Sequence, residues 1–223
     1  MKYLVVVAHP DDEVLSAGAS IYRFVREGNR VAVATLVNHA AARHNLSSHL
    51  GEEQEKARML LGIEKSYAAD FPNIKTNTVP HLELVQFVES CLQDYEPDIV
   101  ITHCPAETNI DHAMVSGAVQ AALRYPQRNE DAKPIRELWY MESASSTEWC
   151  VDSSVRRFTP NLFAEVGEEG LDKKLEALAF YAGVMRDYPH PRSTEALRGL
   201  AAWRGAQAGC KYAEAFEAVF RRI

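Results

Sequence analysis

The sequence lacks the features that mark several large classes of protein. Its 223 residues include only four cysteines, far apart and without a C-x-x-C pair, so neither a disulfide framework nor a zinc ribbon is expected. No apolar run is long enough for a membrane span, and the first residues do not resemble a secretory signal. The net charge of −7 gives no electrostatic reason to expect nucleic acid or an anionic membrane as a partner.

What remains is the profile of a cytoplasmic globular protein. Apolar residues make up 47% of the chain and charged residues 25%, which is typical of a folded domain. Internal repeats, low-complexity segments and linkers are absent from the sequence, and the length suits one core. We therefore expect a single domain over residues 1–223, and the sequence leaves open whether it forms a homo-oligomer.

Strand-like and helix-like patterns alternate along the chain. Apolar or alternating runs predict strands at residues 3–8, 30–37, 66–70, 98–104, 137–142 and 158–166. Helical spacing of apolar residues predicts helices at residues 13–27, 52–61, 80–95, 112–123, 171–184 and 194–208. Residues 213–220 fit neither pattern clearly. This order predicts an α/β, Rossmann-like fold with a mostly parallel sheet flanked by helices.

The first strand and the residues after it carry the most chemistry. The apolar run 3–8 leads directly into His-Pro-Asp-Asp-Glu at residues 9–13. In open α/β sheets, ligands bind just beyond the carboxyl ends of the strands, which is where His9 and Asp12 should lie. One nitrogen ligand with carboxylate oxygens favours zinc or a similar first-row metal over magnesium. Adjacent residues at a helix start point about 100° apart, so Asp11 can face a water molecule instead.

A third metal ligand is expected at the end of another parallel strand. His112 meets this condition, since it opens the helix that follows the strand 98–104. Two simpler explanations compete with a metal site. Asp11 and Asp12 could cap a helix. His103 could lie beside the metal or its ligands, or it could be an ordinary core histidine, which is the interpretation we favour. Capping alone does not account for the whole run 9–13, so the sequence favours a metal-dependent hydrolase.

Several segments resemble a known family. Residues 8–13, Ala-His-Pro-Asp-Asp-Glu, resemble the signature of the LmbE-like (PIG-L) family of zinc-dependent N-deacetylases. Residues 107–112, Glu-Thr-Asn-Ile-Asp-His, resemble its second metal motif, and residues 190–193, 204–205 and 212–216 resemble the tail of members that act on sugars. The resemblance implies a Rossmann-like fold and one zinc ion per chain. It also implies removal of an acetyl group from an N-acetylated amino sugar or sugar conjugate, including nucleotide-linked forms, to give a free amine and acetate.

The resemblance also implies roles for individual residues. His9, Asp12 and His112 would be the zinc ligands. Asp11 would be the general base that accepts a proton from the attacking water, with zinc acting as a Lewis acid. Asp111 would either orient the imidazole of His112 through its second ring nitrogen or cap the helix.

The expected substrate contacts follow from the same resemblance. Many members carry a histidine where this chain has Asn109, whose amide can donate a hydrogen bond but cannot carry a proton. His190 or the general base itself would then protonate the leaving amine. Arg43 and His44 follow the second strand, and Arg192 lies in a proline-rich loop. The forked donors of arginine suit a phosphate or a sugar hydroxyl.

Two other functions compete with deacetylation. The acidic cluster could hold magnesium for phosphoester or nucleotide hydrolysis, although no glycine-rich phosphate loop follows the first strand. The chain could also be a noncatalytic module that binds a metal or a sugar. The presence of Asp11, which such a module would not need, argues against this.

Overall fold

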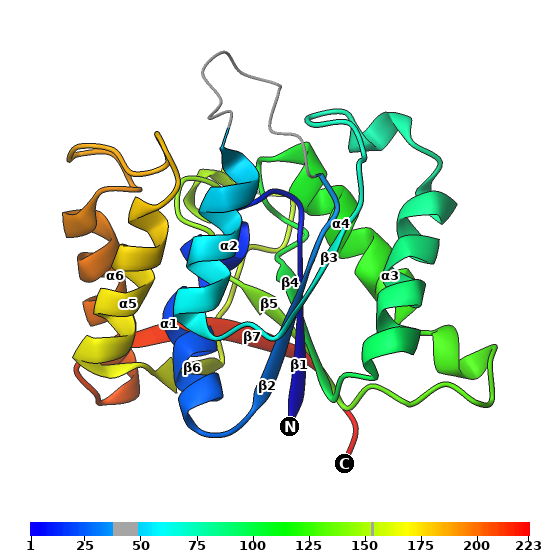
Figure 1. The fold of residues 1–223 in the computed structure, drawn as a ribbon. Helices are drawn as coiled ribbons and strands as arrows, with labels where there is room; N and C mark the ends of the chain where they lie inside the picture. The colour runs from blue at the N-terminus through cyan, green and yellow to red at the C-terminus, as the bar shows by residue number, and fades with distance from the viewer. Residues whose placement is uncertain (38–48, 153) are drawn as a thin grey trace.

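The computed structural model describes residues 1–37, 49–152 and 154–223 (Figure 1). Within these residues, seven strands form one sheet in the order β3-β2-β1-β4-β5-β7-β6. The strands are β1 (Lys2–Val7), β2 (Arg30–Thr35), β3 (Lys65–Ala68), β4 (Ile99–His103), β5 (Glu137–Met141), β6 (Leu162–Glu165) and β7 (Ala213–Arg221). The α-helices are α1 (Asp12–Arg26), α2 (Leu50–Leu61), α3 (His81–Tyr95), α4 (Ile110–Ala122), α5 (Gly167–Ala179) and α6 (Thr194–Ala208). Three short 3₁₀ turns complete the described elements: η1 (Thr76–Thr78), η2 (Tyr125–Gln127) and η3 (Thr147–Trp149).

The sheet is parallel apart from one strand. β1 pairs in parallel with β2 and β4, and β4 pairs in parallel with β5. β7 is antiparallel to both of its neighbours, β5 and β6. The segment that fitted neither sequence pattern is therefore an inner strand. The α/β fold with a mostly parallel sheet is confirmed.

Both faces of the sheet are covered, as Figure 1 shows: α1, α2, α5 and α6 lie on one side, and α3 and α4 on the other. Successive side chains of β1 enter the two cores in turn. Val5 and Val7 belong to one cluster, and Leu4 and Val6 to the other, and all four are fully buried. Burial on both faces explains why this strand is apolar throughout. Among the described residues, no helix is both long and apolar enough to cross a membrane.

Two predicted elements differ from the observed ones by more than two residues at an end. The strand predicted at 158–166 is shorter, because the N–H and hydroxyl of Thr159 bond to the carboxylate of Glu217 instead of joining the strand ladder. The helix predicted at 171–184 begins earlier and ends at Ala179, where the chain turns so that Tyr181 packs into the core.

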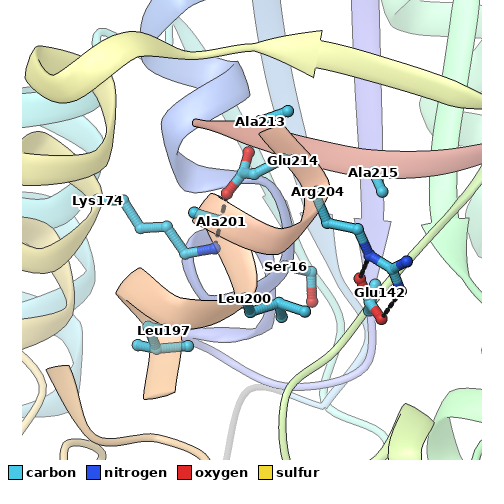
Figure 2. Close-up of a pocket in the computed structure, with 10 residues that line it drawn as sticks. All are labelled: Ser16, Glu142, Lys174, Leu197, Leu200, Ala201, Arg204, Ala213, Glu214 and Ala215. Atoms are coloured by element: carbon cyan, nitrogen blue, oxygen red, sulfur yellow. Dashed lines mark hydrogen bonds and ion pairs between the residues drawn. The ribbon is translucent and has the colours of Figure 1, made fainter. Parts of the chain in front are cut away.

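A buried ion pair ties α5 and β7 to α1, the helix whose first residue is Asp12 (Figure 2). Lys174 Nζ donates to Glu214 Oε1 at 2.6 Å. The same carboxylate accepts from the N–H groups of Ala19 at 3.3 Å and Ser20 at 2.7 Å. Gly18 leaves space for the lysine stem, since a Cβ there would lie 3.2 Å from Lys174 Cγ.

Arg204 and Glu142 form a second ion pair, which lines a small cavity together with Lys174 and Glu214 (Figure 2). Arg204 Nε donates to Glu142 Oε2 at 2.9 Å. The next residue, Gly205, has no room for a side chain, because a Cβ would lie 2.7 Å from the carbonyl oxygen of Cys210. The cavity measures about 20 Å³ and is no larger than a water site. These packing contacts therefore account for the arginine and the glycine at residues 204–205.

Candidate active site

The candidate site forms where two adjacent parallel strands end. β1 and β4 are paired, so the residues that follow them meet at one edge of the sheet. The segment after β1 leads into α1, which begins at Asp12, and the segment after β4 leads into α4, which begins at Ile110. Side chains about a hundred positions apart in the sequence are thereby brought together.

His9, Asp12 and His112 converge at this edge. Asp12 Oδ2 lies 3.1 Å from His9 Nδ1 and 3.3 Å from His112 Nε2. One ligand atom from each of the three lies within 4.8 Å of the others. Around a tetrahedral zinc ion with bonds of about 2.0–2.2 Å, neighbouring ligand atoms are roughly 3.4 Å apart. The spacing and the donor types both fit a first-row metal ion.

Asp11 lies beside this cluster in an unusual backbone conformation. Its φ of 96° is in the left-handed region, which costs a residue with a side chain about 1–3 kcal/mol. The carboxylate makes no capping hydrogen bond to α1, and its Oδ2 lies 3.5 Å from Arg192 Nη1. Burial, followed by the negative charge of Asp12, raises the pKa of Asp11 to about 7, while Arg192 acts to lower it. A buried carboxylate of this kind is poised to accept and release a proton near neutrality.

Asp111 is fully buried and accepts four hydrogen bonds. The donors are His9 Nε2 at 2.9 Å, the N–H of Ile74 at 2.6 Å, and the N–H and hydroxyl of Thr76 at 3.1 and 2.6 Å. Burial alone would raise the pKa of Asp111, but the hydrogen bonds from His9, Thr76 and Ile74 lower it to about 2. Asp111 therefore stays ionised and fixes the His9 ring.

This arrangement corrects both roles expected for Asp111. It holds the imidazole of His9 and not that of His112, because adjacent side chains at a helix start point about 100° apart. The residue that caps α4 is Asn109, whose Oδ1 accepts from the N–H of Asp111 at 2.9 Å. The amide oxygen of Asn109 is thus engaged in the helix start.

Glu107, which was not singled out from the sequence, holds His112. Its carboxylate contacts His112 Nδ1 and accepts from the hydroxyls of Ser146 at 3.1 Å and Thr147 at 2.8 Å. The ring nitrogen His112 Nε2 is then the one that faces Asp12. The sequence feature that could have identified Glu107 is its place at the start of the segment 107–112, five positions before His112.

His103 is more closely tied to the site than an ordinary core histidine. Its fully buried ring stacks on that of His112, with ring centres 3.8 Å apart and an interplanar angle of 18°. Its Nε2 accepts from the N–H of Ala8 at 2.9 Å, and its Nδ1 lies 3.7 Å from Glu107 Oε2. Burial, followed by the neighbouring charge of His112, holds the pKa of His103 well below its usual value. His103, Glu107 and His112 form a second close group of possible metal donors.

Neighbouring carboxylates also set the protonation of His9 and His112. Burial acts to lower the pKa of His9, but hydrogen bonds with Asp111 and Asp12 raise it to about 9. Burial likewise acts to lower the pKa of His112, but Asp12 and Glu107 raise it to about 10. In the apoprotein, both imidazoles are therefore in the doubly protonated, cationic form at neutral pH.

The expected substrate contacts have different positions. Arg192 reaches the site, and its Nε donates to Ser145 Oγ at 2.8 Å. His190 is exposed, and its Nδ1 accepts from the N–H of Arg192 at 3.0 Å. Arg43 and His44 lie outside the described residues.

Fold and site together define an α/β protein with a candidate metal-dependent active site at the carboxyl edge of its sheet. Residues 4–123, more than half of the chain, match the sequence model of the PIG-L family, described as GlcNAc-PI de-N-acetylase. The chain belongs to the PIG-L family. No curated protein sequence matches it.

Solved structures with this fold come from several organisms. A conserved protein from Thermus thermophilus is 20% identical, with a TM-score of 0.82 over 99% of this chain and 96% of that one. The N,N'-diacetylchitobiose deacetylase from Pyrococcus horikoshii is 20% identical, with a TM-score of 0.78 over 98% and 83%. The 4-carboxy-2-hydroxymuconate hydratase from Pseudomonas putida is 21% identical, with a TM-score of 0.78 over 100% and 98%. At these identities the likeness establishes the fold.

Proposed function

We propose that this protein is a zinc-dependent N-deacetylase that acts on an N-acetylated amino sugar or sugar conjugate. The observation that carries the proposal is the buried Asp11 carboxylate beside the convergent donors of His9, Asp12 and His112. The family description and the deacetylase from Pyrococcus horikoshii support this reaction and this class of substrate.

The residues that would hold the metal are His9 through Nδ1, Asp12 through Oδ2 and His112 through Nε2. Carboxylates hold the far ring nitrogens of both histidines, an arrangement that fixes metal-binding imidazoles and raises their basicity. We prefer this set to the group that contains His103, because the Glu107 oxygens already bond to His112 and two hydroxyls. One zinc ion per chain would polarise the acetyl carbonyl and lower the pKa of a water molecule towards neutrality.

The protein groups then account for the proton transfers. Asp11 accepts a proton from the water as its oxygen bonds to the acetyl carbon. The protonated Asp11 passes this proton to the amide nitrogen as the C–N bond breaks, which yields acetate and a free amine. Arg192, anchored by Ser145, favours the ionised form of Asp11 between turnovers. The amide nitrogen of Asn109 is suited to donate to an oxygen of the sugar or the acetyl group.

Zinc affinity should increase steeply with pH. His9 and His112 have pKa values raised to about 9 and about 10, so both are protonated below those values and zinc must displace the protons. Between about pH 6 and pH 8 we expect affinity to rise about ten-fold or more per pH unit. Chelator competition, with proton release followed in weak buffer, measures this directly. Replacing the exposed His81 by alanine should leave the slope unchanged, and a pH-independent affinity would contradict the proposed ligands.

The reaction is tested by measuring acetate and primary amine together. The zinc-loaded protein is incubated with a panel of N-acetyl amino sugars, their glycosides and nucleotide-linked forms. We expect at least one member to give acetate and amine in equal amounts, with loss after chelation and recovery on adding zinc back. The fold is shared with a hydratase, so addition of water without acetate release would identify a different chemistry. Failure of every panel member, despite stoichiometric zinc, would count against this substrate class.

A further inference from the structure

A groove lies on the protein away from the candidate active site. It has a cavity volume of about 620 Å³ and is lined by the end of α4, the turn η2, the start of β5 and the end of β7. These lining segments of β5 and β7 are at the edge of the sheet opposite to the one where His9 and His112 meet. Sites for small molecules usually have volumes of about 300–1,000 Å³, so the groove is large enough for one.

The floor of this groove is apolar. Leu123 comes from the end of α4, and Ile135 and Leu138 come from the start of β5 and the residues before it. Phe220 on β7 pairs with Leu138 across the sheet, yet 48% of its surface is exposed. A ligand with an apolar body would remove this surface from water, which is favourable in proportion to the area buried.

Two arginines also line the groove, Arg124 and Arg222. Within residues 1–37, 49–152 and 154–223, neither guanidinium forms an ion pair with a carboxylate. Their sequence neighbours differ, since Arg128 pairs with Glu89 and Arg221 pairs with Glu137. Two unpaired guanidinium groups are a local positive charge in a chain whose net charge is −7. Arginine binds carboxylates through charge-assisted, often bidentate hydrogen bonds.

We propose that this groove binds a small organic carboxylate with an apolar body, such as a medium-chain acyl carboxylate. The carboxylate bonds to Arg124 and Arg222, and the apolar chain lies along the floor formed by Leu138 and Phe220. A second copy of this chain is a poorer occupant. A symmetric contact across the groove would bring the same two arginines of both copies together, and like charges at an interface are strongly unfavourable. The inference does not depend on the deacetylase reaction.

The test is a calorimetric titration of the full chain with decanoate below its micelle concentration. We expect one saturable site per chain, binding that weakens as salt is added, and at least about ten-fold weaker binding by the Arg124→Glu/Arg222→Glu double variant. Phe220→Ser should also weaken binding, by removing apolar contact. Arg26→Glu, at an exposed position on α1, is the control for changed net charge and should bind decanoate like the wild type.

Three binding results would overturn the proposal. They are the absence of saturable decanoate binding, equal binding by the double arginine variant, and equal binding of decyltrimethylammonium, which has the same chain with a positive head. Sedimentation of the same proteins tests the alternative occupant. A wild-type dimer that Phe220→Ser dissociates would show that a second copy, and not a carboxylate, fills the groove.

Discussion

Replacing Asp11 by asparagine should lower kcat by at least about 10²–10⁴-fold, the usual contribution of a general base, while zinc still binds. The amide cannot accept the proton of the attacking water, and the proposed zinc ligands His9, Asp12 and His112 are untouched. Asparagine is also compatible with the backbone conformation at this position. Asp11 has a φ of 96°, and asparagine is among the few residues with a side chain that tolerate the left-handed region.

The measurement is kcat for the most active substrate of the panel, with the zinc content determined on the same samples. Asp94→Asn is the matched control, since Asp94 pairs with Lys65 at an exposed position and should leave kcat unchanged. Full activity in the Asp11 variant would exclude it as the base. Loss of zinc along with activity would instead show that Asp11 contributes to metal binding.

Lys174→Met should be the most destabilising of the substitutions considered. Lys174 and Glu214 are nearly fully buried, with side-chain exposures of 8% and 6%. Removing the lysine leaves the Glu214 carboxylate inside the protein without its counter-ion, a change that typically costs about 3–5 kcal/mol. In a domain of this size, a loss of about 3 kcal/mol lowers Tm by roughly 6–12 °C. Thermal unfolding followed by circular dichroism measures the shift.

Two further variants complete this measurement of stability: one replaces the neighbouring Lys173, and the other replaces both members of the buried pair. Lys173→Met removes an exposed pair with Glu176, so it should change Tm very little. Lys174→Met/Glu214→Gln removes both buried charges but keeps an oxygen that can accept from the N–H of Ser20. The double variant should therefore be more stable than Lys174→Met alone. If it is less stable, the ion pair is not the reason for the loss.

The sequence predicted the parallel part of the sheet because burial on both faces leaves a plain signature. The run at 3–8 is apolar throughout. The run at 98–104 is apolar apart from Asp98, Thr102 and His103, and both runs form buried central strands. The segment that forms β7 carries glutamates at 214 and 217 whose partners come from other elements, Lys174 on α5 and the backbone of α1 among them. Such pairings are set by the tertiary fold, so local spacing could not reveal that this segment is an inner strand.

The close approach of His9, Asp12 and His112 was predictable, because each follows the end of a parallel strand. The sequence did not predict which carboxylate bonds to which imidazole. That choice depends on the path of the segment between β4 and α4, which places Glu107 against His112 and leaves Asp111 for His9. The path of this segment cannot be predicted from composition or residue spacing. The stacking of His103 on His112 could not be predicted for the same reason.

The two carboxylate braces, Asp111 on His9 and Glu107 on His112, have a practical consequence for spectroscopy. Asp111 bonds to one ring nitrogen of His9, and Glu107 bonds to one ring nitrogen of His112. The other ring nitrogens should therefore keep their positions whether or not a metal ion is bound. Metal exchange by dialysis then needs no refolding. Cobalt(II) introduced in this way would give visible absorption bands whose positions and intensities reveal the coordination number, and whose changes on adding a substrate follow events at the metal itself.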